Sequence, residues 1–404
     1  MNPDAIHFIL ARMIKPSKQS YSLSGQGQRE RLRAGVGATF VLVMAALFSG
    51  SAEIAITIAA EAQTQPDAVA KPGSVSGSGS QPQPQPSIAN PVQQLPLEQS
   101  ASRGITTRDP SSIVKCKDEY WVFYTGRGVP SYRSKDLVKW ERGPAVFKAA
   151  PEWIAKIVPE NRPLQYWAPD VLKLGDRYLL YYSASSFGKM TSAIGLATTP
   201  TLDPDDPAYH WTDQGLVVRT QDGDGYNAID PCVFYDSDGD GSLWLTFGSY
   251  WSGIKLIQLD PQSGKRMAPD SKLVSIAYNE SIEASYLCRN ADYYYLFVNW
   301  GSCCRGPKST YNIRIGRSKT ITGPYLDKAG VDMLHKGGSL FLATTNGPLI
   351  GPGHPGTLKN AQGKDWLTSD FEGDLRMEGK ATLAIMPLRW NAEGWPEATV
   401  NDLK

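Results

Sequence analysis

The sequence is poor in histidine and cysteine, and neither sign of charge is in excess. Four histidines occur in 404 residues, and three of them follow residue 62, which leaves little material for Ser-His-Asp chemistry. The five cysteines lack the paired spacing of a zinc site. Cys303 and Cys304 are adjacent in the sequence. They could form a vicinal disulfide or remain two thiols in a turn. The formal net charge of +1 argues against nucleic acid as the main partner.

The sequence also lacks an uninterrupted apolar run of the roughly 20 residues that span a bilayer. A shorter apolar stretch, Ala34–Phe48, follows a basic segment and precedes small residues, which is the order of a secretory signal. We therefore predict a signal peptide region at residues 1–62 and a secreted protein, periplasmic or extracellular, with no specific membrane partner. An uncleaved N-terminal anchor is the lesser alternative. Residues 63–100, rich in Pro, Gln and Ser, predict a disordered linker.

Long helical periodicity is scarce after residue 100, whereas short aromatic and β-branched runs bounded by turn residues recur, as in β-strands. Five runs recur at intervals of 50 to 73 residues, about the length of one four-stranded blade with its loops. They are Tyr120-Trp-Val-Phe-Tyr, Tyr178-Leu-Leu-Tyr-Tyr, Leu243-Trp-Leu-Thr-Phe, Tyr293-Tyr-Tyr-Leu-Phe and Trp366-Leu-Thr. Residues 101–404 are therefore predicted to be all-β, a five-bladed β-propeller with catalytic function.

A polar group beside Pro, Ala or Gly lies eight to thirteen residues before each run. These groups are Asp109-Pro110, Pro169-Asp170, Asp230-Pro231, Glu283-Ala284 and Gly353-His354. If each run is the second strand of a blade, each polar group begins an innermost strand, and all five converge on one axis. Taken alone, an acid next to proline is an ordinary turn former. Five in register favour a central site.

Three of these groups are carboxylic acids, Asp109, Asp230 and Glu283. An inverting glycosidase needs one acid to protonate the leaving oxygen and one carboxylate to activate water. A third acid nearby keeps the general acid protonated through like-charge repulsion. Aromatic and amide groups in the surrounding segments suit a sugar substrate, although each aromatic taken singly also suits core packing. The pattern therefore indicates glycoside hydrolysis.

Several motifs occur in an order that resembles the endo-α-1,5-L-arabinanases of glycoside hydrolase family 43. They are Arg108-Asp-Pro-Ser, Trp167-Ala-Pro-Asp, Ser186-Phe-Gly, Asn227-Ala-Ile-Asp-Pro, Gly248-Ser-Tyr-Trp-Ser-Gly-Ile, Ile282-Glu-Ala, Cys303-Cys-Arg-Gly, Ser309-Thr-Tyr-Asn-Ile and Gly351-Pro-Gly-His. The resemblance spans about Thr107 to Pro396. It implies an inverting enzyme that acts on arabinan or a related arabinose-containing polysaccharide. We also expect the protein to be a monomer.

The resemblance also implies residue roles. Asp109 would be the general base, Glu283 the general acid, and Asp230 the residue that orients Glu283 and tunes its ionisation. His354 would hold a structural calcium or similar ion on the propeller axis, with no cofactor needed for the chemistry. The resemblance places Trp167, Phe187, Asn227 and Ser249 beside the substrate. Independently of the resemblance, Trp251 and Trp300, aromatic residues in the segments around the acids, are candidates for substrate contact.

The chain departs from the family pattern near these residues. Arg108 stands where arabinanases usually carry His, and Thr368-Ser-Asp-Phe stands where a Tyr-His pair is common. Two other functions fit the same scaffold. One is an exo-acting α-L-arabinofuranosidase or β-xylosidase, and the other is a carbohydrate-binding propeller without catalysis. The intact trio of acids argues against the second, because a lectin has no need of a general acid.

Overall fold

The computed structural model describes residues 105–359 and 363–400, and this part of the chain is nearly all β. It forms five antiparallel sheets and one two-stranded ribbon. One short helix, α1 (Glu152–Ile157), lies between the first and second sheets in the sequence. No helix within these ranges is long and apolar enough to cross a membrane. The predicted signal peptide region and linker lie outside the described residues.

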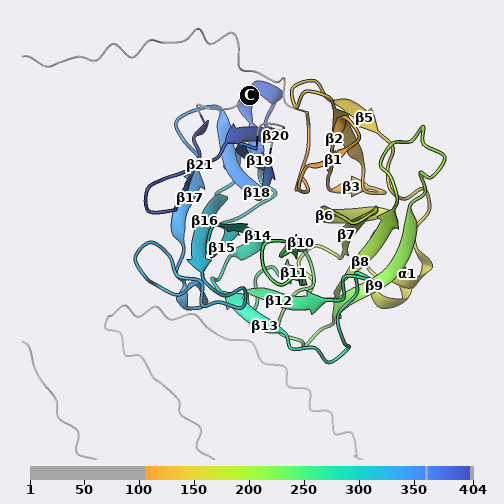
Figure 1. The fold of residues 1–404 in the computed structure, drawn as a ribbon, viewed down its shortest axis with the longest axis horizontal. Coiled ribbons are helices and arrows are strands. Elements are labelled where there is room, and N and C mark those ends of the chain that lie inside the picture. Colours follow the sequence, from red (N-terminus) through yellow and green to blue (C-terminus); the bar gives the residue numbers. More distant parts are fainter. Residues whose placement is uncertain (1–104, 360–362, 401–404) are drawn as a thin grey trace, which may run out of the picture. The chain divides into compact units, whose positions relative to one another are not determined.

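The five sheets surround one axis, which confirms the five-bladed propeller (Figure 1). Within each sheet, strands that follow one another in the sequence are neighbours, running from the axis outward. The first sheet is β1 (Val114–Cys116), β2 (Glu119–Phe123), β4 (Ser131–Ser134) and β5 (Glu141–Gly143). In the second, β3 (Gly126–Arg127) pairs with β6 (Gln165–Leu174), followed by β7 (Arg177–Ala184), β8 (Ser192–Thr199) and β9 (Thr212–Thr220).

The third sheet is β10 (Cys232–Tyr235), β11 (Leu243–Phe247), β12 (Ile254–Leu259) and β13 (Val274–Ala277). The fourth is β14 (Ile282–Asn290), β15 (Tyr293–Trp300), β16 (Asn312–Ser318) and β17 (Ser339–Ala343). The fifth is β18 (Leu349–Lys359), β19 (Asp365–Asp374) and β20 (Lys380–Pro387), and the ribbon is β21 (Arg389–Trp390) with β22 (Pro396–Glu397). Single 3-10 turns occur at η1 (Gly306–Lys308), η2 (Met333–His335) and η3 (Leu375–Met377).

The five aromatic runs lie on the second strands β2, β7, β11, β15 and β19, as predicted from their spacing. These strands are mostly buried because both of their faces are covered by a neighbouring sheet. In β7, Tyr178 and Leu180 pack toward the first sheet, whereas Leu179 and Tyr181 pack toward the third. The described core consists of five such clusters, one at each junction between sheets.

The ring is closed by residues from the two ends of the described chain. The fifth sheet has three strands of its own, and Thr106 forms a bridge with Thr382 at its outer edge. The N–H of Thr107 donates to the carbonyl of Ala381 at 3.2 Å, and the N–H of Leu383 donates to the carbonyl of Ile105 at 3.1 Å. The segment that leads into the first sheet therefore completes the fifth sheet and covers its exposed edge.

Asp170 belongs to this framework and does not line the central cavity, contrary to its expected place among the convergent polar groups. The carboxylate on β6 accepts the N–H of Ser112 at 2.9 Å and the N–H of Val233 at 2.8 Å. It thus links the first, second and third sheets near the axis. Burial raises the pKa of Asp170, and these two backbone N–H groups oppose that shift.

We predict that Asp170→Ala lowers the free energy of unfolding by roughly 2–4 kcal/mol, because it leaves two backbone N–H groups in the interior without an acceptor. Chemical denaturation followed by tryptophan fluorescence measures this loss. Asp176→Ala, at an exposed turn of the same hairpin, is the matched control and should change stability by less than about 0.5 kcal/mol. Equal stability of the two variants would contradict the linking role of Asp170.

Candidate active site

In or before each innermost strand, one non-glycine residue has a positive φ. These residues are Asp109 (49°), Ala168 (39°), Asp230 (57°), Ala284 (50°) and His354 (44°). In β6, β14 and β18 the pairing register shifts at this point, as at a β-bulge. Four of the five residues precede a proline, and in the fourth sheet Ser285 takes that place. Bulges redirect side chains near functional sites, and here all five lie at the same end of the axis.

The bulges define which side chains reach the central cavity, whose volume is about 760 Å³. In the first, third and fifth sheets the residue with positive φ itself lines the cavity, as Asp109, Asp230 or His354. In the second and fourth sheets the bulge residue is alanine, and the residue before it, Trp167 or Glu283, lines the cavity instead. The structure therefore brings together the three predicted acids and His354. The feature that recurs in all five sheets is therefore a residue with positive φ that precedes proline or serine, and not a polar residue at a fixed position.

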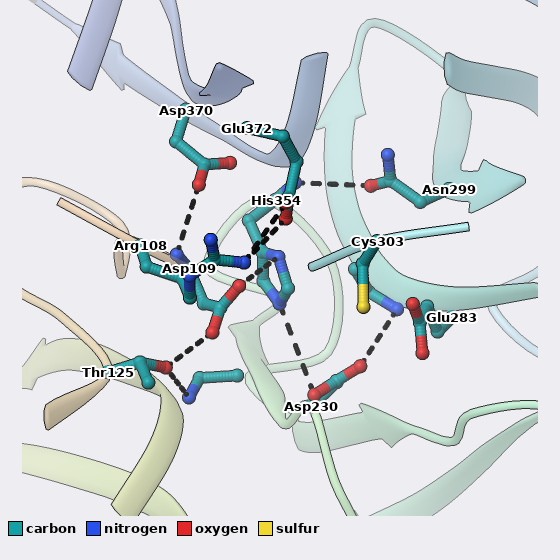
Figure 2. Close-up of polar contacts among 12 residues, drawn as sticks. Arg108, Asp109, Thr125, Asp230, Glu283, Asn299, Cys303, His354, Asp370 and Glu372 are labelled. Carbon is teal, nitrogen blue, oxygen red and sulfur yellow. Dashed lines mark hydrogen bonds and ion pairs between the residues drawn. The ribbon is translucent and has the colours of Figure 1, made fainter. Parts of the chain in front are cut away.

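Asp109 is held from two sides by residues of other segments (Figure 2). The hydroxyl of Thr125 donates to its Oδ2 at 2.5 Å, and Nδ1 of His354 lies 3.3 Å from its Oδ1. The backbone N–H of Asp109 donates to Oδ2 of Asp370 at 3.3 Å. Asp370 is fully buried, and its pKa is raised by burial and by the neighbouring charges of Asp109 and Glu372. These contacts fix the direction in which the Asp109 carboxylate faces the cavity.

Glu283 receives a hydroxyl on each carboxylate oxygen. Ser249 donates to Oε2 at 2.7 Å, and the buried phenol of Tyr311 donates to Oε1. Asp230 lies beside Glu283, and its Oδ2 accepts the N–H of Ala284 at 3.2 Å. Burial and the like charges of Glu283 and Asp109 raise the pKa of Asp230 well above its ordinary value. The carboxyl group of Asp230 therefore ionises less readily than an isolated one does.

Arg108 pairs with Glu372 at the junction of the first and fifth sheets. Its Nη1 lies 3.0 Å from both carboxylate oxygens of Glu372. Oε2 of Glu372 also accepts the N–H of Cys304 at 2.7 Å, which connects the loop after β15 to the same pair. Burial raises the pKa of Glu372, and Arg108 opposes that shift. The arginine noted as a departure in the sequence is thus the counter-charge of a buried carboxylate.

The predicted substrate residues fall into two groups. The cavity is lined by Trp167, Phe187, Asn227, Ser249 and Trp251. Phe187 is 80% exposed and Trp251 is 40% exposed, so both present open aromatic surface at the cavity. Oδ1 of Asn227 accepts a hydrogen bond from the hydroxyl of Ser192 at 2.7 Å. This contact occupies the amide oxygen of Asn227 and not its N–H₂ group.

Trp300 is the exception, and the sequence prediction for it requires correction. It is absent from the cavity lining and packs in the cluster between the third and fourth sheets, with the guanidinium of Arg314 4.6 Å from its ring centroid. Side chains alternate along a strand. Its neighbour on β15, Asn299, faces the axis and accepts the N–H of His354 at 3.1 Å. Trp300 therefore points the other way.

Sequence reasoning missed Thr125, Tyr311 and Glu372, which contact the three-carboxylate site directly or through Arg108. Thr125 follows the aromatic run of the first sheet, and Tyr311 lies within a motif that the family resemblance contains. No spacing rule distinguishes them from other hydroxyl residues. Cys303 and Cys304 also line the cavity, as free thiols whose sulfurs lie 2.6 Å apart.

The model of glycosyl hydrolases family 43 matches residues 105–396. The chain belongs to family 43. It is 40% identical over 300 residues to an extracellular exo-α-(1→5)-L-arabinofuranosidase of Cellvibrio japonicus, covering 71% of this chain and 84% of the relative. It is 39% identical over 300 residues to an extracellular endo-α-(1→5)-L-arabinanase of Bacillus subtilis, covering 71% and 86%.

A solved family 43 structure agrees with the fold. The endo-arabinanase of Bacillus licheniformis superposes with a TM-score of 0.66 at 40% identity, covering 72% of this chain and 97% of that one. The family 43 domain therefore includes all five sheets described above. This membership identifies the protein as a glycoside hydrolase and confirms the resemblance drawn from the motifs.

Proposed function

We propose that this family 43 enzyme hydrolyses α-1,5-linked L-arabinofuranosyl bonds within arabinan, with inversion at the anomeric carbon. The observation that carries the proposal is the convergence of Asp109, Asp230 and Glu283 on one aromatic-lined cavity. Relatives at 39% and 40% identity bear the names of an endo-arabinanase and an exo-arabinofuranosidase, both acting on 1,5-linked arabinose. The shared chemistry supports the substrate class.

In the proposed reaction Asp109 is the general base and Glu283 is the general acid. A water oxygen attacks the anomeric carbon, and its proton passes to Asp109. The glycosidic bond breaks at the same time, and the leaving oxygen takes the proton of Glu283. The two acids act from opposite faces of the sugar ring, so the configuration inverts. The hydroxyls that contact each acid orient it for this transfer.

Asp230 takes no proton from substrate or water in this scheme. It lies beside Glu283, accepts the N–H of Ala284 and is 7% exposed. When Asp230 is ionised, its negative charge disfavours ionisation of the neighbouring acid. Asp230 therefore helps to keep the general acid protonated, and its contact with Ala284 fixes the bulge that carries Glu283.

The cavity supports endo action. A volume of about 760 Å³ lies toward the upper end of the 300–1,000 Å³ typical of small-molecule sites, so more than one pentose ring has room. Aromatic faces suit the apolar faces of sugar rings. Phe187, with 80% of its surface exposed, offers such a face on which a longer chain can continue. The exo-acting relative keeps release of single arabinose units as the second candidate.

We further propose that His354 holds a hydrated calcium or similar cation near the acids. Its Nδ1 faces Asp109, while its Nε2 is buried without a hydrogen-bond partner, 4.0 Å from Oδ1 of Asp230. An imidazole whose Nδ1–H is donated presents a lone pair at Nε2, as metal ligation requires. When bound, the ion would supply positive charge beside the carboxylates.

We predict that calcium added after chelation raises the melting temperature of the wild type by a few degrees, since a ligand that binds only the folded state stabilises it. The same addition should leave His354→Ala unchanged. The matched control is His335→Ala, which removes an exposed histidine and should retain the calcium response. An equal response in all three proteins, measured by calorimetry, would remove His354 from the ion site.

We also infer that the enzyme is exported and acts as a monomer. The basic, apolar and small-residue segments near the N-terminus support export, as do the extracellular relatives. N-terminal sequencing of enzyme recovered outside the cytoplasm, together with its mass by light scattering, tests both statements.

We predict that digestion of linear arabinan gives arabino-oligosaccharides early in the reaction, because endo action cuts within the chain. Proton NMR of the first reducing ends should show the inverted anomer. Asp109→Asn and Glu283→Gln should each lower kcat by a factor of about 10² to 10⁴, the usual worth of a general acid or base. Chromatography of the products and initial rates measure these effects.

Other results have distinct meanings. Arabinose as the sole early product would establish exo action. A retained anomer would refute the base role of Asp109, and activity above half in either acid variant would remove that residue from the mechanism. No activity on arabinan, oligosaccharides or xylan would favour a carbohydrate-binding propeller.

We predict that Asp230→Asn lowers the plateau of kcat and moves the basic limb of its pH profile to lower pH. Without the neighbouring negative charge, the general acid loses its proton more readily as pH rises. Measurement of kcat from pH 4 to 9 in wild type and variant tests this. If Asp230 were only a turn residue before Pro231, Asn would serve equally well, and both plateau and limb would stay unchanged.

A further inference from the structure

We propose that Thr125 is a positioning residue of the reaction. Its hydroxyl donates a hydrogen bond to Oδ2 of Asp109 and thereby fixes the side-chain rotamer of Asp109. This inference rests on the proposed general-base role of Asp109. Thr125 lies after β2 and lines the cavity with Asp109. Its own N–H donates to the carbonyl of Arg108 at 2.9 Å, so its backbone is anchored beside the base.

The direction of the hydroxyl proton follows from its two neighbours. The N–H of Ala168 donates to Oγ1 of Thr125 at 2.7 Å, and a backbone N–H is only a donor. That contact occupies a lone pair of the hydroxyl and leaves its single proton for Oδ2 of Asp109, 2.5 Å away. An ionised carboxylate is only an acceptor, so this chain has one polarity: Ala168 to Thr125 to Asp109.

The source of this donor gives the chain its positional accuracy. Ala168 is the bulge residue of the second sheet and is 3% exposed, so its N–H has a fixed direction. His354, the bulge residue of the fifth sheet, contacts the other oxygen of Asp109. Figure 2 shows both contacts on the carboxylate of Asp109. The base is therefore oriented by the sheets on either side of its own.

The two oxygens are thereby made unequal. Oδ2 accepts from Thr125 and Oδ1 faces His354, so rotation about the Cβ–Cγ bond would break both contacts. A carboxylate held in this way presents its remaining lone pairs in a constant direction. Attack by water requires that direction to be maintained as the glycosidic bond breaks. Loss of the hydroxyl should therefore affect turnover more than substrate binding.

The test compares Thr125→Val, which keeps the shape and removes the hydroxyl, with Thr125→Ser, which keeps the hydroxyl. We expect the Val variant to lose kcat roughly 10- to 100-fold, the effect of losing a hydrogen bond to a charged group. KM should stay within about threefold, and the Ser variant should retain most of the activity. Thr125→Ala serves as a second hydroxyl-free variant if the Val protein does not fold.

The chain offers a matched control in Thr199, at the outer end of β8. Its buried hydroxyl also bridges two groups, because it accepts the N–H of His210 at 3.4 Å and donates to the carbonyl of Thr201 at 2.8 Å. Neither group belongs to the cavity lining. Thr199→Val should lower the melting temperature and leave kcat unchanged.

A second substrate separates the base side of the site from the acid side. A 4-nitrophenyl arabino-oligosaccharide has a leaving group that departs without protonation, so it reduces the need for Glu283 and still needs Asp109. Thr125→Val should be slow on this substrate as well as on arabinan, in parallel with Asp109→Asn. Tyr311→Phe, which removes a donor to Glu283, should recover on the aryl substrate.

Three results would overturn the inference: a Val variant within twofold of wild type, equal losses in the Val and Ser variants, or recovery of the Val variant on the aryl substrate. Each would have this meaning while Asp109→Asn remains inactive. Full activity of Asp109→Asn would refute the proposed base role itself, so the two failures are distinguishable.

Discussion

The main physical constraint on this structure is that several carboxyl groups lie close together and are largely shielded from water. Asp109, Asp230, Glu283, Asp370 and Glu372 all lie near one end of the propeller axis. An ionised carboxylate in such surroundings is costly unless it is paired and hydrogen-bonded. The observed arrangement offsets this cost with one guanidinium, several hydroxyls and backbone N–H groups. Burial and mutual repulsion still raise the pKa values of Asp230, Asp370 and Glu372.

Neighbouring sheets help to orient each acid. Asp109 of the first sheet is oriented by Ala168 of the second through Thr125 and by His354 of the fifth. Asp170 shows the same principle away from the cavity, because it joins three sheets through two backbone N–H groups. Stability of the ring and geometry of the site therefore have a common physical basis. A change that loosens one junction between sheets should disturb both.

The bulges add a second constraint. A non-glycine residue at positive φ costs of order 1–3 kcal/mol and persists only when its surroundings determine it. Here one such residue lies in or before each innermost strand, and in β6, β14 and β18 the strand pairing on both sides holds it in place. The residue at this position is Asp109, Asp230 or His354 in three sheets. It is alanine in the other two, where the preceding residue, Trp167 or Glu283, lines the cavity. The pair Arg108–Glu372 shows how this chain fills the position next to the base with a different counter-charge from the histidine usual in arabinanases.

The sequence by itself determined the fold class, the number of sheets and the three acids. Those inferences rest on periodic signals: the aromatic second strands recur because both faces of each are buried, and a polar residue recurs in or before each innermost strand. The repeat placed Asp170 at the axis, and Trp300 was expected at the cavity from its residue type, but neither side chain lines the cavity. A shift of one residue along a strand turns a side chain to the opposite face, and a repeat read from the sequence does not fix the position to one residue. Tertiary structure alone decided which residues orient the acids. Thr125, Tyr311 and Glu372 reach the site from other segments, and contacts between residues distant in sequence leave no periodic trace in one chain.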